Sequence, residues 1–192
     1  MTLKDMKKKT LSLIEEIVDN PDSTTITSLT NDPDIEAKLN YVINQIQFEL
    51  ARIKKMPEYV EIDVEKDDLI DFDTIRTETS NEVYQIDICR GINYELKADG
   101  TIVKCLEDGT LELEYYKYPT RIDKTTPDTF EFELSDDVLE IMPYGVAADL
   151  LKSDVSNAYG NVYANRYENM KQELDTRYNT GYIEFCDDGM VI

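Results

Sequence analysis

The chain has 192 residues, about the length of one domain, and its 41% hydrophobic residues suffice for one core that needs neither disulfides nor a structural metal. Its 41 acidic and 20 basic residues give a formal net charge of −21 at pH 7, which disfavours tight nucleic-acid binding, because such binding needs clustered lysine and arginine. The three cysteines, Cys89, Cys105 and Cys186, show no close pairing, and neither a secretion signal nor a membrane-spanning stretch is expected.

Two helices are predicted at the start of the chain. Apolar side chains recur every three or four residues over 3–18, which is typical of an amphipathic helix. A second helix is predicted over 33–55, because Asp32 offers an N-cap oxygen and Pro33 suits a first helical turn. It should end before Pro57, which disfavours helical geometry in the preceding residue. Its inward face is expected to consist of Ile35, Leu39, Val42, Ile43, Ile46, Leu50 and Ile53.

The pattern then changes to a period of two, which indicates a β insertion over about 58–118. The last three expected strands are separated by Asp99-Gly100 and Asp108-Gly109, dipeptides that favour tight hairpin turns. We therefore expect these three strands to form an antiparallel meander. The expected strands are 60–64, 83–88, 92–96, 101–106 and 110–118.

The segment from Glu61 to Asp87 carries ten acidic and two basic residues, a local net charge of −8. Calcium binding is one interpretation, but the segment has no Asp-x-Asp-x-Asp-Gly loop, and Leu69, Ile70 and Phe72 interrupt the oxygen ligands that such a loop needs. We expect instead a mobile, solvated arm that could serve as a docking element.

Helices are predicted again near the end of the chain. The first covers 135–152, with Ser135-Asp136-Asp137 as its cap and Pro143 as a kink or a restart. The second covers 155–177. Together with the earlier elements, they predict the α+β class: a bundle of about four helices with an inserted antiparallel β meander, in one domain over 1–181. Residues 182–192 are not helical in pattern and are expected to form an extended C-terminal tail.

The residues that could carry chemistry are few. The chain contains no histidine, which removes Ser-His and Cys-His nucleophile pairs and histidine-liganded metals, and its glycines are too far apart for a phosphate-binding loop. Asp87, Glu95 and Lys97 resemble the pattern with which some nucleases hold Mg²⁺, although a solvated hairpin face explains them better. The cysteines lack zinc-knuckle spacing. We expect no enzyme activity, no catalytic residues, no metal and no cofactor.

Several short sequences resemble the head-to-tail connector proteins of tailed bacteriophages, which are also called adaptor or head completion proteins. The resemblance covers about Leu3 to Arg177 and lies in the order of helices and strands rather than in catalytic residues. The sequences that carry it are Asp32–Ile35, Lys38–Asn40, Ile43–Gln45, Glu49–Arg52, Leu113–Pro119, Pro143–Leu150 and Arg166–Lys171.

This resemblance implies a virion protein of the neck, made in the host cytoplasm, that forms a ring, usually twelve-fold, below the portal protein. The ring would link the portal to tail or neck proteins, and its acidity would let DNA pass without specific binding. No membrane is involved. The tail residues are expected to add a strand to a portal edge or to wedge into it, and other residues to contact neighbouring subunits or the tail. The docking residues are Tyr182, Ile183, Phe185, Val191 and Ile192; the contact residues are Leu69, Ile70, Phe72, Tyr116, Tyr118 and Tyr163.

Two other functions remain open from the sequence. An acidic DNA mimic that occupies a host nuclease or repressor would share the excess of carboxylates. A metal-dependent nuclease would use Asp87, Glu95 and Lys97. The mimic should compete with DNA for its target, whereas the adaptor should ignore DNA and bind the portal.

Overall fold

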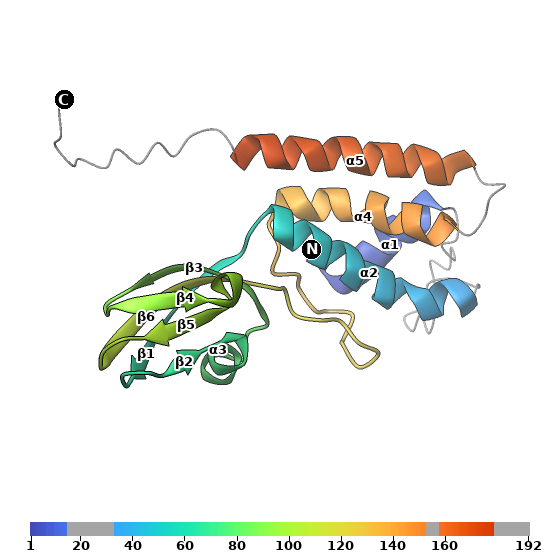
Figure 1. The fold of residues 1–192 in the computed structure, drawn as a ribbon. Coiled ribbons are helices and arrows are strands. Elements are labelled where there is room, and N and C mark those ends of the chain that lie inside the picture. Colours follow the sequence, from blue (N-terminus) through green and yellow to red (C-terminus); the bar gives the residue numbers. More distant parts are fainter. Residues whose placement is uncertain (15–32, 153–157, 179–192) are drawn as a thin grey trace, which may run out of the picture.

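The computed structural model describes residues 1–14, 33–152 and 158–178. Figure 1 shows these residues in two units, one built from long helices packed side by side and one from two small antiparallel sheets with a short helix. The expected α+β class is confirmed. None of the helices in these three ranges is long and apolar enough to cross a membrane.

The helical unit contains four helices around one core. All seven side chains expected on the inner face of the second helix pack into this core, and five of them are buried. The first helix is confirmed as far as Leu13, and residues 15–18 of its predicted range lie outside the described residues. The helices are α1 (Leu3–Leu13), α2 (Pro33–Ile53), α4 (Asp136–Leu151) and α5 (Ala158–Tyr178).

Helix α4 is apolar around most of its circumference because it contacts the other three helices. It runs on through Pro143, which is buried, so the expected restart of the helix at this proline is wrong. Ser135 occupies the N-cap position, as predicted, but its side chain makes no capping hydrogen bond. Asp136 and Asp137 lie in the first turn, where their negative charge is favourable toward the helix dipole.

The β unit contains six strands in two antiparallel sheets. Their orders are β1-β6-β3 and β2-β5-β4, and the inner faces of both sheets share one core that includes Val103, Leu111, Leu113 and Tyr115. The strands are β1 (Pro57–Val64), β2 (Leu69–Ile70), β3 (Val83–Arg90), β4 (Tyr94–Lys97), β5 (Ile102–Cys105) and β6 (Gly109–Lys117).

The expected three-stranded meander is wrong in its last step. β4 and β5 form the predicted hairpin, and its turn holds Ala98, Asp99 and Gly100 at positive φ. Asp108-Gly109, by contrast, carries the chain from one sheet to the other, and β6 lies between β1 and β3. The cause is burial, because two facing sheets hide the alternate apolar side chains of β6, which a lone meander would leave exposed.

The acidic segment 61–87 is not a mobile arm. It contains part of β1, all of β2 and the helix α3 (Phe72–Thr79), and it contributes Ile75 to the β core. Asp71 caps α3, since its carboxylate accepts a hydrogen bond of 2.8 Å from the backbone N–H of Thr74, and this bond lowers the pKa of Asp71. The segment is ordered, and its carboxylates lie on the solvent-exposed side.

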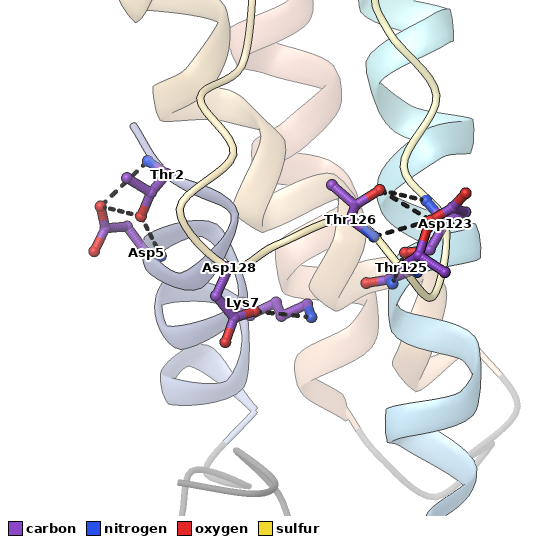
Figure 2. A network of polar contacts seen from close by, with 8 residues as sticks. Thr2, Asp5, Lys7, Asp123, Thr125, Thr126 and Asp128 are labelled. Carbon is purple, nitrogen blue, oxygen red and sulfur yellow. Dashed lines mark hydrogen bonds and ion pairs between the residues drawn. The ribbon is translucent and has the colours of Figure 1, made fainter. Parts of the chain in front are cut away.

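The loop that joins β6 to α4 holds the helical unit together (Figure 1). Its backbone carbonyls accept hydrogen bonds from the first amides of α1, from Leu3 to Phe130 and from Lys4 to Asp128. The ammonium of Lys7 lies 3.5 Å from the carboxylate of Asp128, as Figure 2 shows. The first turn of α1 therefore depends on a segment far along the chain.

The same loop is also fixed to α2. The buried amide of Asn44 donates to the carbonyl of Ile122 at 2.6 Å and accepts from the amide of Ile122 at 2.8 Å. Asp123 accepts hydrogen bonds from Thr125 and Thr126 and so closes a tight turn, also visible in Figure 2. Helices α1 and α2 are thus tied to each other through one connecting loop.

We predict that Gly145→Ala destabilises the protein. A Cβ at this position would lie 2.8 to 3.1 Å from three ring atoms of Tyr167, so α5 would have to move away from α4. The free energy of unfolding, measured by urea denaturation, should fall by about 1 to 3 kcal/mol. Helix propensity alone predicts the opposite sign, a gain of about 1 kcal/mol. In a Tyr167→Leu background the loss should shrink or vanish, and an unchanged loss there would contradict the contact.

Candidate interaction surfaces

The seam between the two units is formed by five side chains, which we call the seam cluster: Phe48, Arg52, Tyr84, Tyr116 and Tyr118. The rings of Tyr84 and Tyr118 lie 4.7 Å apart, and those of Phe48 and Tyr118 lie 5.2 Å apart. The guanidinium of Arg52 donates two hydrogen bonds to the hydroxyl of Tyr118, one of them at 2.7 Å. Burial raises the pKa of Tyr84 to about 12, and its hydroxyl donates to a carbonyl of α2. These contacts stabilise the seam within one chain.

The six residues expected to contact other subunits lie in different parts of the structure, and three of them have partners within the chain. Tyr116 and Tyr118 are half-buried in the seam cluster. Tyr163 donates a hydrogen bond of 2.6 Å to the carbonyl of Leu13. These three side chains therefore have partners within the chain.

The other three expected contact residues belong to the β unit. Ile70 is only 5% exposed, because its side chain fills the β core, so it offers little surface for the expected contact with another subunit. Phe72 is half-buried against the same core. Leu69 is 56% exposed and is the member of the six that a partner can reach directly. The five docking residues of the tail lie outside the described residues.

The three residues of the nuclease alternative are distributed over two sheets. Glu95 and Lys97 both lie on β4, with carboxylate and ammonium 3.3 Å apart. Asp87 lies on β3 of the other sheet and accepts a hydrogen bond of 2.6 Å from the hydroxyl of Tyr116. Across the described ranges, no group of three or more Asp, Glu, Cys or His is arranged to hold a metal ion.

Two of the cysteines are structural. Cys89 and Cys105 are buried free thiols in the β core. Burial raises the pKa of Cys89 to about 11 and also raises that of Cys105, so both thiols are protonated at neutral pH. The third cysteine, Cys186, lies outside the described part of the chain.

The outer face of the β1-β6-β3 sheet is acidic. Glu61 lies directly opposite Glu112, and Tyr59 lies opposite Glu114. The hydroxyl of Tyr59 donates a 2.8 Å hydrogen bond to Glu61, which raises the pKa of Tyr59 to about 12. Like charges directly opposite each other destabilise a sheet. On this face the repulsion is reduced by water and by Arg90 of β3, which lies opposite Glu112 and 4.0 Å from the carboxylate of Glu114. We call this surface the acidic sheet face: Tyr59, Glu61, Asp63, Glu112 and Glu114.

A groove between α1, α4 and α5 has the opposite charge. Its cavity has a volume of about 600 Å³, and it is lined by Lys8, Lys9 and Arg166 with one acid, Glu140. The guanidinium of Arg166 lies over the ring of Tyr144, 4.3 Å from its centroid. We call this feature the basic groove. It groups positively charged side chains in a protein whose net charge is strongly negative.

The third surface is the free side of β4, which we call the β4 edge. β4 pairs with β5, and no strand in the described ranges pairs with its other side. Tyr94 lies opposite Cys105 and Leu96 opposite Val103, so both point to the same face as buried core residues. They are nevertheless 37% and 52% exposed. The sequence alone missed this surface, because the alternation of β4 is the same as that of a covered strand.

A cluster of ion pairs holds the β unit to the connecting loop. The ammonium of Lys117 lies 3.0 Å from the carboxylate of Glu58 and 3.1 Å from that of Glu133. Glu133 also accepts hydrogen bonds from the amide and the hydroxyl of Thr120. Partial burial raises the pKa of Glu133, but Thr120 and Lys117 lower it by more, so the net shift is downward.

We predict that Glu133→Gln lowers stability at neutral pH. Because the folded-state pKa of Glu133 is depressed, its charge stabilises the fold above the unfolded pKa of about 4.3, and this contribution is lost as the pH falls through the folded value. The free energy of unfolding should drop by about 1 kcal/mol at pH 7 and decline less steeply than in wild type between about pH 5 and pH 3. Glu131→Gln, two positions earlier, is the matched loss of one carboxylate. Identical behaviour of the two variants would contradict this role of Glu133.

The described residues thus present three open surfaces of different chemistry: the acidic sheet face, the basic groove and the β4 edge. Their function has to follow from the residues themselves and from their geometry. No protein-family model matches the chain, and no curated protein matches it.

Proposed function

We propose that the protein is a structural subunit of a bacteriophage neck, a head-to-tail adaptor. Copies of the chain assemble into a ring below the portal protein, link it to tail or neck proteins, and leave a channel through which DNA passes without specific binding. The observation that carries the proposal is the pair of uncovered apolar side chains, Tyr94 and Leu96, at the free edge of one sheet of the inserted β unit.

This pair belongs to a group that is apparent from the distribution of exposed side chains. Eight large apolar side chains are exposed in the described part of the chain, and four of them lie on or directly beside the β2-β5-β4 sheet. Single exposed apolar residues are normal on a monomer, whereas a group of them usually marks a protein contact. The four are Leu69, Tyr94, Leu96 and Leu106. Tyr94 and Leu96 point to the same side at the β4 edge, whereas Leu69, opposite Lys104 on β2, points to the other side of the sheet.

The charges of the chain also favour self-association. Residues 57–117 carry 17 acidic and six basic side chains, a formal charge of −11, whereas residues 1–14 carry four lysines and one aspartate, a charge of +3. Opposite charges on two different surfaces of one chain favour contact between unlike faces of neighbouring copies. Such a head-to-tail contact generates a ring when its rotation closes.

The DNA channel and the portal contact complete the proposal. A ring of subunits that each carry a formal charge of −21 repels the phosphate backbone, so DNA can slide through it without binding tightly. The C-terminal residues from Tyr182 to Ile192 supply the contact with the portal, since their apolar positions suit strand addition to a sheet edge. Both roles follow the resemblance to the connector proteins.

We predict that the purified chain forms rings, alone or on the portal protein of the same phage. Light scattering should give a mass that is a multiple of the 22.2 kDa subunit, and negative-stain images should show a central hole. In a gel-retardation assay at moderate salt, the protein should not shift duplex DNA. A chain that stays monomeric and does not bind the portal would contradict the adaptor function.

The acidic sheet face favours one second candidate, a DNA mimic that occupies a DNA-binding protein. Glu61, Glu112 and Glu114 lie together on one regular surface, as phosphates do along a strand, although Arg90 lies beside Glu112 and Glu114. A mimic would form a small stable oligomer and compete with DNA for its target. In that case Glu61→Gln with Glu112→Gln should weaken the competition, whereas ring assembly would not be observed.

A further inference from the structure

We propose that the β4 edge accepts residues 182–187 of a neighbouring copy as an added strand. Each subunit would give its C-terminal segment to one neighbour and receive that of the other. The inference rests on the proposed ring and names the contact that closes it. On this inference Tyr182, Ile183 and Phe185 bind a neighbouring subunit in place of the portal, and Val191 and Ile192 remain as the portal contact.

The β4 edge has the properties of an acceptor. A strand with a free side offers unpaired backbone N–H and C=O groups, which another extended chain can pair with. Natural edges are usually protected by a covering element or by charged side chains that point inward. At the β4 edge, Tyr94 and Leu96 point instead toward the core side and lie open, so an added strand would cover apolar surface as well as backbone.

The C-terminal segment has the properties of a donor. Tyr182, Ile183 and Phe185 are residue types that are enriched in strands. In an extended chain, Ile183 and Phe185 lie on one face, and Glu184 and Cys186 lie on the other. Asp187 follows on the face of Ile183 and Phe185, and Tyr182 lies on the face of Glu184, so the apolar part of the first face consists of two residues.

One antiparallel register pairs Phe185 with Leu96 and places Asp187 opposite Tyr94, whose hydroxyl can donate to the carboxylate. With Phe185 opposite Leu96, the two apolar side chains cover each other on the core side. On the outer side, the same register places Glu184 opposite Lys97 and Cys186 opposite Glu95. The first of these pairs joins opposite charges, which is the favourable arrangement for directly opposed residues.

The position at which α5 ends determines how far the C-terminal segment can extend. Helix α5 ends at Tyr178 on the side of the molecule that carries the β unit (Figure 1). The seven residues from there to Phe185 span at most about 25 Å when fully extended. This length limits the acceptor to a β4 edge near the end of α5, and in the proposed ring that edge belongs to the directly adjacent subunit. Because donor and acceptor are different surfaces, the contact is heterologous and can repeat around a closed ring.

The register is tested by a disulfide between Glu95→Cys and the native Cys186. Under oxidised glutathione, the variant should form a ladder of covalent multimers on a non-reducing gel, since the two sulfurs lie on opposed residues of neighbouring strands. Cys89 and Cys105 contribute little background, because burial keeps them protonated. Glu78→Cys, exposed on α3, is the matched control, and Glu95→Cys with Cys186→Ser removes the partner. Both controls should lack the ladder.

Two outcomes of this experiment would overturn the inference. A crosslink within one chain would show that the segment covers its own β4 edge. A ladder equally strong in the Glu78→Cys control would show that the segment meets neighbours without preference for β4.

Assembly provides a second, non-covalent test. Leu96→Lys should weaken self-association at least about tenfold, equivalent to 1.4 kcal/mol, and deletion of residues 179–192 should do the same or more. Val162→Lys on α5 is the matched control, with an exposed fraction of 57% against 52% for Leu96, and should assemble as wild type does. Circular dichroism confirms that each variant is folded.

The experiments distinguish a wrong β4 contact from a wrong ring function. If the chain lacking 179–192 still forms rings of unchanged mass and affinity, the β4 contact is wrong while the adaptor function stands. If the Glu95→Cys variant crosslinks to Cys186 of another copy, but the full chain forms only pairs or open chains with and without the portal, the β4 contact stands while the ring function is wrong.

Discussion

The chain passes between the helices and the β unit twice, at the start of β1 and at the end of β6. The rest of the structure depends on the pairing of these two segments. Pro57 at the start of β1 lies opposite Tyr116 near the end of β6, and the amide of Lys117 donates to the carbonyl of Met56 at 3.1 Å. The chain therefore returns to the helical unit at the place where it left. An insertion built in this way leaves the four-helix core intact. The seam cluster then fixes the inserted unit against α2 through tilted ring contacts and the Arg52 hydrogen bonds.

Much of the helical unit could be predicted from the sequence, because helical periodicity is a local property. The seven inward residues of α2 follow directly from their spacing, and the alternation of β1 is equally clear. The division of the strands into two sheets could not be predicted, since it depends on β6 pairing with residues of β1 as distant as Pro57 is from Tyr116, about sixty positions. Helix α3 was hidden among carboxylates, although the Asp71 cap three residues before Thr74 was a usable signal.

The candidate surfaces could be predicted only in part, because sequence gives composition and not position. The excess of acids is plain from the counts, but the opposition of Glu61 and Glu112 on one face depends on strand register. Tyrosines expected at subunit contacts were used inside the chain, in the seam and against α1. Conversely, Leu96 has the same local pattern as a covered strand residue, and its exposure follows from the edge position of β4. Burial is a tertiary property, so neither result was accessible from spacing.

The connecting loop also determines when each part of the protein can become stable during synthesis. The contact between Lys7 and Asp128 joins residues 121 positions apart, and the first amides of α1 bond to the same loop. The N-terminal helix therefore emerges from the ribosome long before its partners exist, whereas the β unit can fold as soon as its own strands have been translated. Closing contacts of such long separation is slow compared with forming local ones. The N-terminal helix is thus translated first but packs among the last. The nascent chain contains a folded β unit before α1 has made its contacts with the connecting loop.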